Sequence, residues 1–89
     1  MRTHHLIASV DRRAFAAEAV RYGFSPSDFA LKIHRVPSKL LLRYLPTATF
    51  VVTVENVKNG NCASYLGGPG RSWIARFVED LVAGTFGQP

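Results

Sequence analysis

A hairpin signal in the second half of the chain constrains the fold most strongly. Residues 49–57 are rich in β-branched side chains and lead into Asn59-Gly60, the dipeptide most typical of a tight hairpin turn. A two-residue turn pairs Val57 with Cys62 and predicts that Cys62 is a small buried side chain. The hairpin face expected to meet the core carries Phe50, Val52, Val54 and Tyr65.

The first half of the chain predicts two helices joined by a tight turn. The first helix covers residues 12–22, with Asp11 as its cap and Gly23 as its left-handed end. The run Ser25-Pro26-Ser27-Asp28 has the form of a capping box with proline at the first helical position. A second helix is therefore expected to begin in this run and to end before Pro37.

Three further segments complete the predicted fold. Residues 5–10 alternate weakly and suit a short strand, and residues 38–45 are compatible with a third helix or a buried strand, with helix favoured. Residues 72–83 have the spacing of an amphipathic helix that ends at Gly84. We therefore expect one small α+β domain over residues 1–89. Its three-stranded antiparallel sheet, made of the N-terminal strand and the hairpin, packs with two to four helices.

The surplus positive charge lies entirely in the first half of the chain. Residues 1–46 hold eight Lys or Arg and three Asp or Glu, whereas residues 47–89 hold three of each, so the net charge of +5 belongs to the first half. A basic helical half thus precedes a neutral hairpin-helix half. Charge concentrated on one stretch can steer an anionic partner. Nucleic acid is the favoured partner, and an acidic protein surface is the alternative.

Residues 15–35 add a pattern that points to nucleic acid. They place the small Ala19 in the first helix, Gly23-Phe24-Ser25 in the turn and Phe29 in the second helix. This arrangement resembles the second helix-turn-helix unit of AraC-type regulators. The resemblance implies a second helix in the major groove and a first helix on the backbone. The residues expected to contact nucleic acid or an acidic partner are Arg12, Arg13, Arg21, Ser27, Lys32, Arg35, Lys39, Arg43 and Lys58.

Two smaller features add candidate contacts with phosphate. The basic-tipped hairpin resembles the wing of a winged helix, which brings in Lys58, although an ordinary turn explains the same residues. Gly70, Arg71 and Ser72 precede the last helix and could form an anion seat from backbone amides, a guanidinium and a hydroxyl. The structural alternative is a sharp bend from strand into helix.

The expected activity is binding without catalysis. No spacing places a nucleophile beside an oriented base, and no metal or cofactor site is predicted. The alternative hypothesis is a protein-binding inhibitor or adaptor, of the size common among phage and mobile-element proteins such as anti-CRISPR proteins, and self-association into a homodimer is a third. The aromatic anchors expected for a protein partner are Tyr22, Tyr44, Trp73 and Phe86.

The sequence also bears on the cellular compartment. The lone Cys62 permits no internal disulfide and favours a reducing compartment. No apolar run approaches the roughly 18 residues needed to span a bilayer. We therefore expect a cytoplasmic protein.

Overall fold

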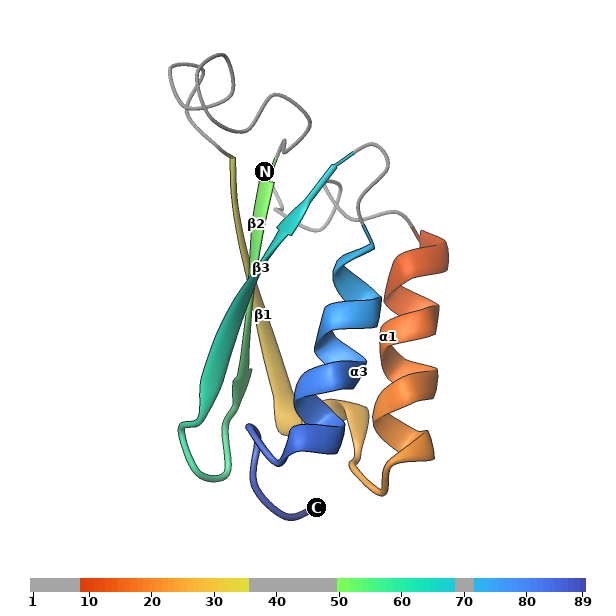
Figure 1. The fold of residues 1–89 in the computed structure, drawn as a ribbon, viewed down its shortest axis with the longest axis vertical. Coiled ribbons are helices and arrows are strands. Elements are labelled where there is room, and N and C mark those ends of the chain that lie inside the picture. Colours follow the sequence, from red (N-terminus) through yellow and green to blue (C-terminus); the bar gives the residue numbers. More distant parts are fainter. Residues whose placement is uncertain (1–8, 36–49, 69–71) are drawn as a thin grey trace.

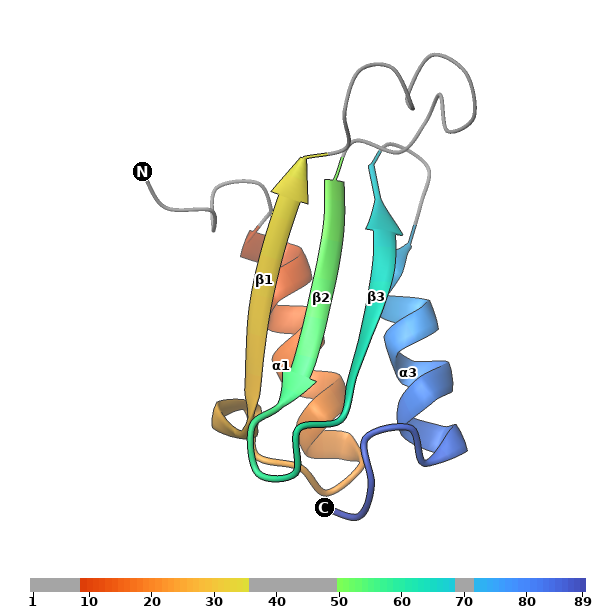
Figure 2. The same ribbon diagram turned by 90° about the vertical axis from the view of Figure 1, so that its left-hand side faces the viewer.

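The protein combines a three-stranded antiparallel sheet with two helices on one of its faces. The computed structural model describes residues 9–35, 50–68 and 72–89. The strand order is β1-β2-β3, and both helices lie side by side against the same face of the sheet (Figures 1 and 2). Within the described residues no helix lies on the other face, which we call the uncovered face. The α+β class and the antiparallel sheet are confirmed, and the predicted third helix over residues 38–45 lies outside the described residues. The elements are α1 (Ser9–Arg21), the 3-10 turn η2 (Pro26–Asp28), β1 (Phe29–Arg35), β2 (Phe50–Asn56), β3 (Cys62–Gly67) and α3 (Trp73–Ala83).

Helix α1 begins earlier than the sequence predicts. Ser9 and Val10 are helical, so the strand expected over residues 5–10 is wrong at these two positions, and the rest of that segment lies outside the described residues. Asp11 lies within the first turn, where its negative carboxylate interacts favourably with the positive end of the helix dipole. The helix ends as predicted, because Gly23 adopts a φ of 91° that side-chain-bearing residues rarely adopt.

The third strand of the sheet comes from a segment predicted to be helical. Ser25 N–H does donate to Asp28 Oδ2 at 3.3 Å, as a capping box requires, but only the single turn η2 follows. Phe29 and Ile33 are buried, and their spacing of four fits both a helix and a strand. Leu31, halfway between them, shares their face only in a strand, and there it packs against the core. Burial of this alternating set against α1 and α3 therefore overrides the local helix signal.

The hairpin forms with a longer turn than predicted. Val52 pairs with Tyr65, and Glu55 pairs with Cys62, two residues away from the expected register. The cause is Asn56, whose side-chain Oδ1 accepts the N–H of Lys58 at 3.0 Å and so starts the turn early. Because the shift is even, the predicted inner face is preserved, but Cys62 is exposed, which corrects its predicted burial.

Helix α3 begins one residue later than predicted and ends at Ala83, before Gly84, as predicted. The Ser72 side chain accepts the N–H of Ala75 at 3.3 Å, and Gly84 closes the helix with a φ of 82°. Two of the aromatic side chains predicted as exposed anchors are instead fully buried: Trp73 is 1% exposed and Phe86 is 0% exposed. Burial of these large rings between the helices and the sheet stabilises the fold more than exposure to solvent would.

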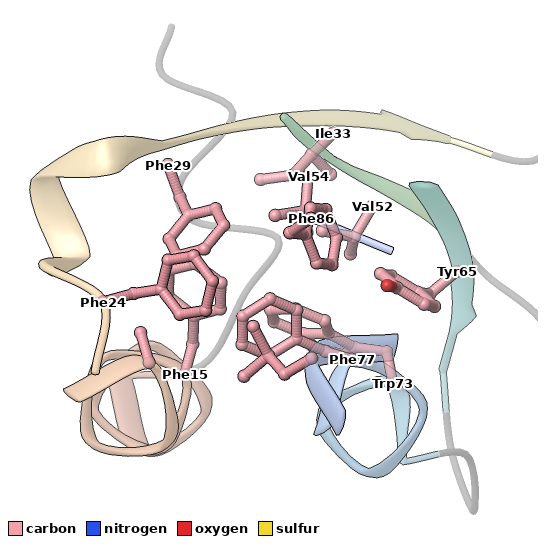
Figure 3. Close-up of a cluster of buried hydrophobic side chains, with 12 residues drawn as sticks. Phe15, Phe24, Phe29, Ile33, Val52, Val54, Tyr65, Trp73, Phe77 and Phe86 are labelled. Carbon is pink, nitrogen blue, oxygen red and sulfur yellow. The ribbon is translucent and has the colours of Figure 1, made fainter. Parts of the chain in front are cut away.

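One aromatic cluster joins all the layers of the described fold. The rings of Phe15 on α1 and Phe77 on α3 lie 4.7 Å apart between centroids, and Phe29 on β1 meets Phe77 edge-on at 5.6 Å (Figure 3). Edge-to-face and tilted packing of this kind is favourable beyond the area that it buries. The cluster therefore fixes how α1 lies against β1, and this relation positions the candidate site.

Candidate functional site

Four of the predicted basic residues lie in the first half of α1 and in the second half of β1, from Lys32 onward. Figure 1 shows the first turns of α1 and the last residues of β1 at the same end of the molecule. Arg12 and Arg13 are exposed on α1, and Lys32 and Arg35 are exposed on β1. Within the part of the chain that the structure describes, none of the four has a carboxylate oxygen within 4.0 Å. We call this group of Arg12, Arg13, Lys32 and Arg35 the cationic end.

A groove separates α1 from the edge strand β1 at the cationic end. It has a volume of about 430 Å³, and the described residues that line it are Arg12, Arg13, Phe15, Ala16 and Leu31. Arg12 and Ala16 are four residues apart and so lie on one side of the helix. Ala16 and Leu31 are half-buried and Phe15 is buried, whereas the two arginines are exposed. The groove thus has an apolar floor beneath a rim that carries two guanidinium groups.

Strand β1 carries the other two cations on opposite faces of the sheet. Arg35 has the same parity as Leu31 and Ile33, which places it on the face that the helices cover. Lys32 has the opposite parity and lies on the uncovered face, where it is the register partner of Thr53. Among the described strands, β1 pairs only with β2, so it is an edge of the sheet (Figure 2). An anion at this edge can therefore contact side chains from both faces.

Two other predicted basic residues, Arg21 and Lys58, lie at the opposite end of the molecule and are paired with carboxylates. Arg21 Nη1 is 3.7 Å from Glu18 Oε1, and its guanidinium lies 5.8 Å from the centroid of the Tyr22 ring. Lys58 Nζ is 3.6 Å from Asp28 Oδ2. These exposed pairs contribute little to stability. They do reduce the positive field at this end, so the structure divides the predicted basic residues into two groups.

The other predicted contacts do not join the cationic end. Ser27 is exposed in η2, where its hydroxyl lies 2.9 Å from that of Ser25. Ser72 uses its hydroxyl to cap α3. The remaining predicted residues, Lys39 and Arg43 between β1 and β2, and Gly70 and Arg71 before α3, lie outside the described residues.

The helix that was expected to enter the major groove is not formed. Residues 15–35 contain one helix, the Gly23 turn, η2 and then a strand, so Lys32 and Arg35 are presented by a sheet edge. Sequence reasoning also missed the groove floor made by Phe15, Ala16 and Leu31. The available signal was the alternation of Phe29, Leu31 and Ile33, which predicts a strand face when Leu31 is counted.

Comparisons of the chain with protein-family models, with curated proteins and with solved structures find no match. None of the helices in the described ranges has the length and apolar character that crossing a membrane requires.

Proposed function

We propose that this protein binds nucleic acid without altering it covalently, and that the cationic end contacts the phosphate backbone. The observation that carries the proposal is the position of Arg12 and Arg13 on the groove between α1 and β1, away from the carboxylates that pair with Arg21 and Lys58. Guanidinium groups bind phosphate through several N–H donors in a fixed plane, which favours these side chains for contact with a polyanion.

The placement of the two arginines on α1 supports the proposal independently. Arg12 is the fourth residue of α1 and closes its first turn, where a cation opposes the positive end of the dipole at a cost of up to roughly 0.3–1 kcal/mol, and Arg13 follows it. Asp11 in the same turn offsets part of this cost. A bound phosphate would interact favourably with the dipole and with both guanidinium groups. The arrangement therefore gains stability when an anion is present.

The test is a titration of labelled duplex and single-stranded DNA at about 50 and 200 mM salt, because phosphate contacts release counterions and make affinity depend on salt. We expect affinity to fall steeply between the two conditions. The double variant Arg12→Gln/Arg13→Gln should lower the magnitude of the slope of log affinity against log salt by roughly 2 on duplex DNA, about 0.9 for each lost contact.

The matched control is Arg21→Gln/Lys58→Gln, which removes two positive charges from the other end. If the cationic end is the site, the control should retain most of the affinity and of the salt slope. Equal losses in both double variants would mean that binding follows net charge alone and would contradict the proposed site. Weak binding that does not respond to salt would contradict the proposed function itself.

A further inference from the structure

We propose that the groove between α1 and β1 holds an unstacked base, so that the protein prefers single-stranded nucleic acid to duplex. This inference rests on the proposed function and names the substrate class for the same site. It is carried by the combination of an apolar floor with a cationic rim. Contact with the phosphate backbone of a nucleic acid explains the rim of Arg12 and Arg13. It does not explain the apolar floor made by Phe15, Ala16 and Leu31.

The dimensions and lining of the groove suit a flat ring. Its volume of about 430 Å³ falls within the range of about 300–1,000 Å³ typical of small-molecule sites. Such sites are mostly apolar with a few placed polar groups, and here three apolar side chains accompany two arginines. A base has apolar faces and a polar edge, so it can cover the floor while its flanking phosphates meet the rim.

The small size of Ala16 is what keeps the groove open. Ala16 lies on α1, one turn after Arg12, and Leu31 faces it from β1 as part of the same lining. A longer side chain at position 16 would extend into the space between helix and strand. Ala17 is also on α1 but is exposed and does not line the groove.

A paired base cannot reach this floor. In a duplex the bases are stacked and only their edges are accessible, so a groove beneath an arginine rim would meet phosphates alone. Single strands present bases that can be splayed out, packed on apolar surfaces and stacked against arginine planes. The apolar floor beside Arg12 and Arg13 therefore favours a single-stranded partner, whose bases are free to cover it.

The experiment compares three DNA probes by fluorescence anisotropy in one buffer: a short single strand, its duplex, and a strand of equal length whose internal nucleotides lack bases. The abasic strand has the same charge as the normal strand, so it isolates the base. We expect the normal strand to bind about tenfold more tightly than the abasic strand. The affinity for the duplex, expressed per phosphate contact, should be similar to the affinity for the abasic strand.

Ala16→Leu should abolish this discrimination by lowering affinity for the normal strand to that for the abasic strand. The matched control Ala17→Leu adds the same side chain outside the groove and should leave discrimination unchanged. Equal binding of normal and abasic strands by the unmodified protein would overturn the inference, even if Ala16→Leu does not fold. Loss of binding in Arg12→Gln/Arg13→Gln would then still support phosphate contact. Absence of salt-dependent binding to all three probes would instead overturn the proposed function.

Discussion

The hydroxyl of Tyr65 on β3 donates a hydrogen bond of 2.6 Å to Asp80 Oδ2 on α3. The ring of Tyr65 is buried beside Trp73, and Thr85 Oγ1 lies 3.4 Å from the second oxygen of the same carboxylate. Burial, the hydrogen bond to Asp80 and the negative charge of Asp80 together raise the pKa of Tyr65 well above its ordinary value. The hydrogen bond between Tyr65 and Asp80 therefore links β3 to α3 only while the phenol keeps its proton.

Stability should fall in alkaline solution because of Tyr65. Above about pH 10 the unfolded chain ionises this phenol while the folded chain keeps it protonated, so the unfolded state binds fewer protons and the free energy of unfolding decreases with pH. The expected slope is about 1.4 kcal/mol per pH unit. Urea unfolding followed by Trp73 fluorescence measures it. Tyr65→Phe should flatten the slope and Tyr22→Phe should not; the same slope in both variants would contradict the assignment.

Removal of the Asn56 side chain should destabilise the fold. Asn56 is 2% exposed, its Nδ2 donates to the carbonyl oxygen of Phe86 at 3.0 Å, and its Oδ1 accepts from Lys58 N–H. Asn56→Ala loses both bonds inside the protein, and we expect a cost of about 1–3 kcal/mol.

The control for this prediction is Asn61→Ala in the same turn, since Asn61 is exposed. We expect a change within about 0.5 kcal/mol for this variant. Chemical denaturation at neutral pH compares the two. If both substitutions cost the same, the buried amide would not be what ties the hairpin to the C-terminal segment.

Gly67 should tolerate no side chain while Phe50 faces it. The two are register partners on β3 and β2, and a Cβ added at Gly67 would collide with the end of the Phe50 ring. We expect Gly67→Ala to cost about 1–3 kcal/mol through displacement of that ring. The double variant with Phe50→Leu should recover part of the loss, which a double-mutant cycle would detect as coupling. Strict additivity would show that the ring is not the obstacle.

Cys62 should react with a maleimide in the folded protein. The structure exposes its side chain on the uncovered face of the sheet, opposite Glu55. We expect complete labelling without denaturant, which mass spectrometry would show as one added group, and none in Cys62→Ser. Protection that is lost only in urea would contradict the exposed position and would favour the burial that the sequence suggests.

The inner face of the hairpin could be predicted from sequence even though the register could not. Alternation assigned Val52, Val54 and Tyr65 to one face, and the two-residue shift kept them there. The shift itself depends on the Asn56 side chain accepting a backbone N–H and on its amide reaching Phe86, thirty residues later. A rule based on the Asn-Gly dipeptide contains neither contact. The predicted burial of Cys62 is wrong for a separate reason, since Cys62 lies on the face opposite Val52 and Val54 in either register.

Strand β1 shows where local patterns compete. Pro26 and Asp28 start a helical turn as their types predict, yet the chain becomes extended at Phe29. The strand forms because β1 pairs with β2 and because Phe29 and Ile33 are buried against two helices. These tertiary interactions outweigh the local helix propensity of the segment.

The candidate site was predictable only as a list of basic residues. The charge count identifies Arg12, Arg13, Lys32 and Arg35 among others, but their grouping depends on β1 being an edge strand beside the start of α1. The pairing of Arg21 with Glu18 follows from helical spacing and was accessible from sequence. The pairing of Lys58 with Asp28 joins two distant segments and was not.

The side-chain amides of Asn56 and Asn59 both donate hydrogen bonds to the carbonyl oxygen of Phe86. This shared acceptor has a consequence for the order in which the chain folds. During synthesis the hairpin can pair its strands as soon as residue 67 has emerged, but its turn lacks this acceptor until about twenty further residues have followed. Completion of the hairpin is thus deferred until α3 and the segment after it have been made.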